Sequence, residues 1–157
     1  MAKYPLKPLL ELRERTVDAK TLELGDAVRA RESAEVVRAR AERMRRDAEE
    51  AAARVKAEEA ERLARGELCV VDLARGEAWG YASAAQIVQL TRAVDTAAAK
   101  VAGAREGEDG ARHVLAQTMA DRDVVAKDRA RFDERTKKRV VEAEEEAAEE
   151  AFRGGRA

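Results

Sequence analysis

The chain has 157 residues, of which 40% are charged, 3% are aromatic and 45% are nominally hydrophobic, and its formal net charge is −1. Much of the hydrophobic fraction is alanine, so the composition excludes a large compact core and favours a single domain of long helices. Acidic and basic residues interleave along the chain, which argues against a nucleic-acid-binding surface, because such a surface needs uncompensated positive charge.

The compartment is suggested by what the sequence lacks. Cys69 is the only cysteine, so an internal disulfide is excluded and a reducing compartment is favoured. The N-terminus lacks the apolar run of a secretory signal, and no stretch of about 18 apolar residues could cross a bilayer. We therefore expect a cytoplasmic protein without a transmembrane segment.

The first predicted helix runs from about residue 7 to residue 65. Pro5 and Pro8 stand before and within its first turn, where proline is tolerated, and Gly66 is a plausible stop. Apolar or small residues recur along it at helical intervals, with a slip of one residue between the fourth and seventh members: Leu6, Leu10, Val17, Leu24, Ala27, Ala34, Val37, Ala41, Met44, Ala48 and Val55. We expect this stripe to contact a second helix.

A turn is predicted over residues 66–83. Residues 67–73 are rich in β-branched side chains, glycines follow, and Ser83 with Gln86 fits a capping box that would start the next helix. A connection of this length is either a functional loop or a small plug over the open end of the coil.

The second predicted helix covers about residues 84–152. Its stripe alternates intervals of three and four: Ile87, Leu90, Val94, Ala97, Val101, Ala104, Ala111, Leu115, Val125 and Phe132, interrupted by Glu108, Thr118, Arg122 and Arg129. Gly103, Gly107 and Gly110 weaken the helix, but the stripe keeps one phase across them, which predicts a continuous helix. Beyond Phe132 a basic run and a glutamate-rich run predict a solvated end.

The two stripes predict the fold class: all-α, a long two-helix antiparallel coiled-coil hairpin. If residue 65 lies beside residue 84, paired residue numbers sum to about 149 and Val17 meets Phe132, although a shift of one heptad fits equally well. A parallel dimer of single long helices competes with this fold, but residues 66–80 would interrupt such a helix. We therefore expect a monomer.

The chain offers little for catalysis. His113 is the sole histidine and Cys69 the sole thiol, and the hairpin holds them apart, so we expect His113 to be a solvated helix residue. The glutamates near the end lack an ordered ligand loop for a metal ion. We predict no enzymatic activity, no metal site and no cofactor.

Two groups of residues suggest binding surfaces. Leu6, Leu9, Leu10 and Leu12 are more apolar than one partner helix requires, so they either face another protein or clamp the second helix at its two adjacent valines, Val140 and Val141. Basic residues gather at the same end of the predicted hairpin: Arg13, Arg15, Lys20, Arg135, Lys137, Lys138 and Arg139. They are either solvated flanks or a basic band that suits an acidic-lined protein ring.

Both ends of the chain resemble one family. Residues 4–15 (Tyr-Pro-Leu-Lys-Pro-Leu-Leu-Glu-Leu-Arg-Glu-Arg) are similar to the start of the FliJ and YscO proteins of flagellar export and type III secretion. Residues 131–134 (Arg-Phe-Asp-Glu) and the glutamate run into residues 149–152 (Glu-Glu-Ala-Phe) resemble the YscO branch in particular. Length and two-helix layout agree as well.

The resemblance implies a non-enzymatic stalk that is peripheral to the inner-membrane secretion apparatus. Its joint terminal end would enter the hexameric secretion ATPase through Leu6, Leu9, Leu10, Arg13, Arg135, Lys138 and Arg139. The other part would contact the export gate and substrate chaperones around Met44, Gln86 and Leu90. Relatives often carry aromatic residues in that part, where this chain has alanine, as at Ala41 and Ala48. The flagellar counterpart and a free coiled-coil chaperone or dimeric adaptor are the alternatives.

Overall fold

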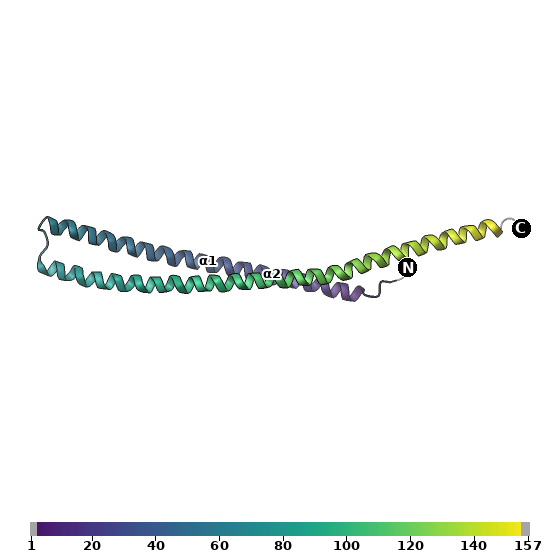
Figure 1. The fold of residues 1–157 in the computed structure, drawn as a ribbon, viewed down its shortest axis with the longest axis horizontal. Coiled ribbons are helices and arrows are strands. Elements are labelled where there is room, and N and C mark those ends of the chain that lie inside the picture. Colours follow the sequence, from purple (N-terminus) through teal and green to yellow (C-terminus); the bar gives the residue numbers. More distant parts are fainter. Residues whose placement is uncertain (1–2, 155–157) are drawn as a thin grey trace. The chain divides into compact units, whose positions relative to one another are not determined.

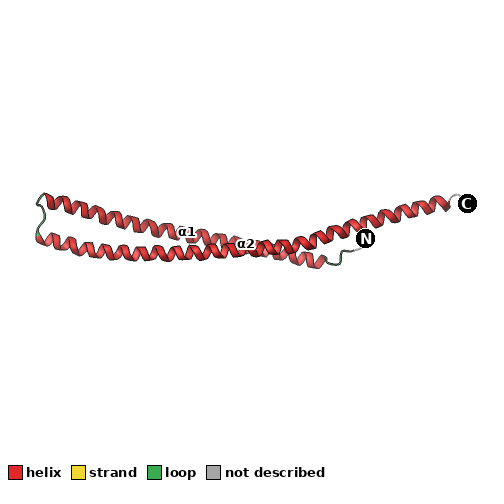
Figure 2. Cartoon of the chain, viewed as in Figure 1, coloured by secondary structure: helices red, strands yellow, loops and turns green. Residues whose placement is uncertain are grey.

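The fold consists of two long helices that pack against each other (Figures 1 and 2). The computed structural model describes residues 3–154, and within them it contains no strand. Helix α1 spans Lys7–Ala64 (58 residues) and helix α2 spans Val70–Gly154 (85 residues). The chain divides into two compact units, each described separately below: unit 1 comprises residues 1–25 and 110–157, and unit 2 comprises residues 26–109. The predicted all-α class is confirmed.

The pairing of the helices is antiparallel in both units. In unit 1, Tyr4 lies beside Asp128 and Arg13 beside Asp121. In unit 2, Arg31 pairs with Glu108 and Glu35 with Arg105, so residue numbers rise along one helix as they fall along the other.

The seam, meaning the line of contact between α1 and α2, follows the predicted stripe on α2. Val94, Ala97 and Val101 in unit 2 and Val125 in unit 1 are buried, with Val101 only 2% exposed. The predicted interruption at Glu108 also faces the seam and is buried. Helix α2 continues through its three central glycines, as the constant phase of the stripe predicted.

The predicted stripe on α1 is only partly correct in unit 2: its alanines Ala34, Ala41 and Ala48 are half-buried, but the residues placed by the predicted slip are not. Val37 and Met44 are about half exposed, whereas Arg31, Arg38 and Arg45 are only partly exposed. These arginines stand at successive seven-residue steps after Leu24, so the heptad continues without the predicted slip. An arginine can occupy a seam position because its aliphatic stem covers apolar surface while the guanidinium reaches the edge.

The connection between the helices is shorter than predicted. Helix α1 ends as expected: the N–H groups of Gly66 and Glu67 donate to the carbonyls of Leu63 and Arg62, which is a Schellman arrangement, and Gly66 adopts a φ of 70°. Helix α2 then begins at Val70 instead of residue 84.

The early start of α2 has a local cause. The backbone N–H of Cys69 donates to Asp72 Oδ2 at 3.2 Å, which caps the first turn. The β-branched residues that follow are therefore held in a helix despite their strand propensity. The predicted capping box at Ser83 is wrong, because Ser83 Oγ donates to the carbonyl of Gly80 inside the helix.

The predicted register is also wrong. The ion pairs of Arg31 with Glu108 and of Glu35 with Arg105 join residues whose numbers sum to 139 and 140, not 149. In unit 1, Phe132 packs against Tyr4 instead of Val17, with the ring centroids 5.4 Å apart. A heptad stripe defines which face of a helix is buried but not its axial position, so the misplaced start of α2 shifted every predicted pair.

The glycines of α2 provide a stability test in unit 2. A Cβ at Gly103 or Gly107 would meet no atom within 4 Å, so G103A and G107A should each raise the free energy of unfolding by about 1 kcal/mol, since alanine is the better helix former. Thermal denaturation followed by circular dichroism measures this.

G66A is the matched control. Gly66 also has open space around it, but its positive φ is unfavourable for alanine, so G66A should lower the stability by about 1 kcal/mol. A lower midpoint for G103A or G107A would contradict the open environment of these glycines.

Candidate functional site

The first candidate site is the terminal surface of unit 1, defined by the residues expected to bind the ATPase: Leu6, Leu9, Leu10, Arg13, Arg135, Lys138 and Arg139. Helix phase separates the buried Leu10 from the exposed Leu12, whereas Leu6 lies before the first residue of α1. Leu10 belongs to the seam and is 4% exposed, as is Val17 one heptad later at 9%, whereas Leu6 remains 43% exposed. Only part of the apolar excess is therefore available to another molecule.

Leu6 borders an open hollow on α2. This hollow of about 440 Å³ is lined by Leu6, Val124, Val125, Lys127, Asp128 and Arg131. The alternative in which the leucines clamp Val140 and Val141 is wrong, because both valines are about half exposed. They lie on later turns of α2.

Tyr4 anchors the segment before α1, a role that the sequence analysis missed. Its hydroxyl donates to Asp128 Oδ2 at 2.8 Å and lies 3.3 Å from the carbonyl of Val125, and its ring is tilted by 58° to that of Phe132. Partial burial, reinforced by the Asp128 carboxylate, raises the pKa of Tyr4 above its ordinary value of 10.0. This anchor fixes the position of Leu6, and the only sequence signal for it was the rarity of aromatic residues.

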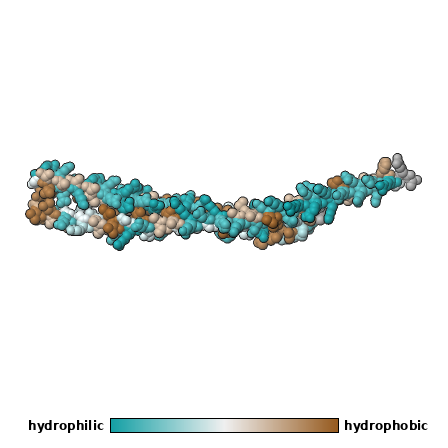
Figure 3. Space-filling model, viewed as in Figure 1, coloured by the Kyte–Doolittle hydropathy of each residue, from teal (hydrophilic) through white to brown (hydrophobic). Residues whose placement is uncertain are grey.

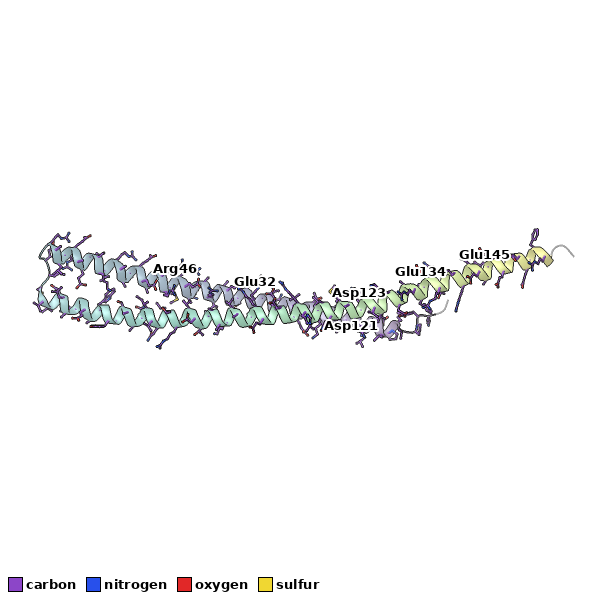
Figure 4. The ribbon with its side chains drawn as sticks, viewed as in Figure 1. Glu32, Arg46, Asp121, Asp123, Glu134 and Glu145 are labelled. Atoms are coloured by element: carbon purple, nitrogen blue, oxygen red, sulfur yellow. The ribbon has the colours of Figure 1, made fainter. Side chains whose placement is uncertain are left out.

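The basic residues of the terminal surface differ in their availability. Arg13 Nη1 lies 3.1 Å from Asp121 Oδ2, so Arg13 binds α2 within unit 1 (Figure 4 labels Asp121). Arg135, Lys138 and Arg139 are exposed. They lie three to seven residues beyond Phe132, which corresponds to about 5–10 Å along the helix. The exposed cations therefore sit next to the Tyr4 anchor, on α2 alone.

The second candidate site lies in unit 2 and comprises Met44, Gln86 and Leu90. Met44 is 51% exposed, Gln86 is exposed and Leu90 is half-buried in the seam. Met44 lies seven residues after the exposed Val37, so the two share one face of α1. Beside Val37, a hollow of about 350 Å³ is lined by Ala30, Ser33, Ala34, Val37, Ala97 and Lys100. The small alanines leave this face open instead of filling it.

A cluster of four charged residues crosses the seam of unit 2. Arg31 Nε lies 2.5 Å from Glu108 Oε2 and Arg31 Nη1 lies 2.8 Å from Glu35, while Arg105 Nη2 reaches Glu35 at 2.9 Å. The hydrogen bond to Glu108 raises the pKa of the Arg31 guanidinium, and the hydrogen bond from Arg105 lowers the pKa of the Glu35 carboxyl below 4.5. Glu108 is 5% exposed, so it depends on this pairing.

The charged cluster acts on register and not on chemistry. A buried charge is stable only beside a counter-charge, so Glu108 disfavours any slide that moves it off the arginine series, whereas a slide of one heptad toward Arg38 would still give it an arginine. The sequence signal that could have revealed it is the series of arginines at heptad spacing after Leu24.

The connection end of unit 2 is apolar and exposed (Figure 3, brown). Val70 is 81% exposed and Tyr81 72%, and a hollow of about 420 Å³ lies next to Trp79 and Leu73. These residues lie on the first turns of α2, so the predicted plug is not formed. Cys69 is exposed and its thiol donates to Asp72 Oδ2 at 3.0 Å, which lowers the pKa of that carboxyl.

The reactive residues lie apart from any built site. His113 is exposed on α2, and within residues 3–154 no cluster of three histidine, cysteine, aspartate or glutamate side chains could hold a metal ion.

Neither described helix is long and apolar enough to cross a membrane. Comparisons with protein-family models, with curated proteins and with solved structures found no match. The function is therefore inferred from the terminal surface of unit 1 and from the face around Met44 in unit 2.

The Arg31–Glu108 pair supplies a double-mutant test. R31L and E108L should each lower the thermal midpoint of unfolding, because each removes the ion pair across the seam and leaves one charge there. Replacing both residues by leucine should recover the midpoint or raise it, since leucines at these two seam positions pack against each other. Circular dichroism melts of the two single variants and the double variant measure the coupling. Additive losses would contradict a direct interaction.

Proposed function

We propose that this chain is the non-enzymatic central stalk of a bacterial type III secretion apparatus. In this role it docks into the hexameric secretion ATPase through the terminal surface and links the ATPase to the export gate. The proposal starts from the resemblance of residues 4–15 and 131–134 to the FliJ and YscO proteins. The observation that carries it is the Tyr4 anchor, which ties the amino-terminal segment to α2 and leaves Leu6 exposed close to exposed cations.

The terminal surface combines the two properties that insertion into a protein ring requires. Exposed cations at Arg135, Lys138 and Arg139 would steer the helix end toward an acidic ring and fix its orientation, while an exposed leucine supplies apolar contact area. The paired helices of unit 1 provide a preorganised surface, so little conformational entropy is lost on docking.

The face around Met44 suits the second contact of a stalk. Val37 and Met44 are exposed on one side of α1, beside the open alanine-lined hollow. A partner helix or loop could bury them, because methionine adapts to differently shaped surfaces. We assign the export gate, and substrate chaperones that use the same face, to this surface together with Gln86 and Leu90.

The first test measures the ATPase. Adding the chain at less than one copy per hexamer should increase the turnover of the cognate secretion ATPase, and R135E/K138E/R139E should raise the concentration needed for half-maximal stimulation about tenfold or more, because the steering charges are reversed. The matched control is R43E/R46E/R54E, which reverses three exposed charges of α1 in unit 2.

The control variant should stimulate like the natural chain. Stimulation that is absent for the natural chain, or equally weakened by both triple variants, would contradict docking through the terminal surface.

The second test measures stability. The alanine-rich seam buries little apolar area, at ~25 cal/mol per Å², so the free chain should unfold at a low temperature and gain several degrees when the ATPase is present in excess. Differential scanning calorimetry with and without the ATPase would show this gain. A high thermal midpoint of unfolding that the ATPase leaves unchanged would contradict the proposed marginal stability of the free chain and its gain on binding.

The same experiments distinguish two alternative functions. The flagellar export counterpart would stimulate a flagellar ATPase instead, since the preference for the injectisome branch rests on the acidic end of the chain. A free chaperone or dimeric adaptor would hold a client without affecting any ATPase. Because α1 and α2 already occupy each other's seam, an adaptor would have to use the face around Met44.

A further inference from the structure

The last part of α2 in unit 1 has no helix beside it. Tyr4 contacts Asp128 and Phe132, whereas all residues from 133 to 154 are exposed except Thr136, which is half-buried. We call residues 133–154 the extension; at ~1.5 Å per residue it is about 33 Å long. Figure 4 places Glu145 on this single stretch of helix.

Among the mixed charges of the extension, two runs of three consecutive like charges stand out. A basic block contains Lys137, Lys138 and Arg139, and an acidic block seven residues later contains Glu144, Glu145 and Glu146. Within the described part of the chain no ion pair joins one block to the other. Residues seven apart lie on nearly the same side of a helix, so each cation has a glutamate on its own side, two turns further along.

The acidic block is placed unfavourably for a lone helix. Glutamates repeat there at intervals of four, as at Glu142, Glu146 and Glu150, and like charges at that spacing destabilise a helix. Arg153, 3.7 Å from Glu149, offsets part of this repulsion. The end would therefore gain stability from positive charge supplied by another molecule.

The apolar residues of the extension lie between and beyond the charge blocks. Val140 and Val141 are 46% and 50% exposed at the junction of the blocks, and exposed alanines continue the same side: Ala147, Ala148 and Ala151. On a helical wheel these residues share one broad face with Lys137 and Glu144. A partner helix that covers this face must carry a negative charge opposite Lys137 and a positive one opposite Glu144.

We propose that the extension is a self-association site, at which a second copy of this chain binds in the antiparallel direction. A two-fold axis near Val141 would place the basic block of each copy against the acidic block of the other, with the paired valines at the centre. A parallel arrangement would instead set like charges side by side, which is destabilising. The interface is short and rich in alanine, so the dimer is weak and depends on salt.

This site does not rest on the proposed function, but it bears on it. Lys138 and Arg139 belong to both the basic block and the terminal surface, so a self-associated chain cannot present them to another partner. In the dimer the second copy would cover Lys138 and Arg139, so the chain could dock on the ATPase only after a tighter-binding partner displaces that copy.

Charge reversal in the purified full chain tests the proposal. Sedimentation velocity should show concentration-dependent dimers at about 50 mM salt that are lost at about 500 mM. K137E/K138E/R139E and E144K/E145K/E146K should each remain monomeric, whereas an equal mixture should form dimers again. R43E/R46E/R54E in unit 2 controls for the change in charge and should dimerise like the natural chain.

Cysteine cross-linking tests the direction of the pair. In a C69S background, V141C lies beside the axis and should form an intermolecular disulfide, whereas A151C lies about 15 Å along each helix from the axis and should not. Equal cross-linking at both positions would indicate parallel helices and overturn the proposal. A natural chain that stays monomeric at low salt, or reversed variants whose mixture does not dimerise, would overturn it as well.

Discussion

The structure depends on a narrow seam, in which valines and alanines of α2 meet leucine, valine, alanine and arginine side chains of α1. In unit 2, Ala97 and Val101 of α2 face a line of α1 that carries arginines at three successive seven-residue steps, Arg31, Arg38 and Arg45. Such a seam lets the helix axes approach closely but buries little apolar area, so direction and register need another source of specificity. The Arg31–Glu108 pair supplies part of it, because the buried carboxylate excludes every register that sets it opposite a residue other than an arginine.

The composition of the seam also explains which parts of the helix pairing can be predicted from the sequence. The stripe of α2 was predicted because valine, leucine and alanine repeat there at heptad spacing, and Val94, Val101 and Val125 are indeed buried. The later stripe of α1 is predicted only in part, because hydrophobic periodicity ignores arginine: Ala41 and Ala48 are half-buried as expected, but Arg45 and not Met44 stands in the seam. The axial register could not be predicted, since a heptad pattern repeats itself and the charged cluster is recognisable only once both helices are in place.

The predictions of the connection and of part of the candidate site are wrong for a different reason. Residues 70–83 include β-branched residues and glycines that are poor helix formers, but the cap formed by Cys69 and Asp72 starts a helix that continues through them. At the terminal surface the sequence indicates the leucine cluster but not that Leu10 is buried while Leu6 stays exposed, because Leu6 lies in the segment before α1 that Tyr4 anchors. The contribution of Tyr4 is a contact between residues more than 120 positions apart in the chain, which no local pattern contains.

A narrow seam also explains why the outer faces of these helices are the places to look for function. A helix pair that buries only one line of residues leaves most of its surface in contact with solvent, so an exposed apolar residue there has no structural role in holding the pair together. Met44 in unit 2, and Leu6 and Val141 in unit 1, are of this kind. The charges around each of them differ: mixed near Met44, basic near Leu6, and divided into opposite blocks around Val141. Because charge selects partners and apolar area holds them, the three surfaces would bind different partners even though each is built on the same two helices.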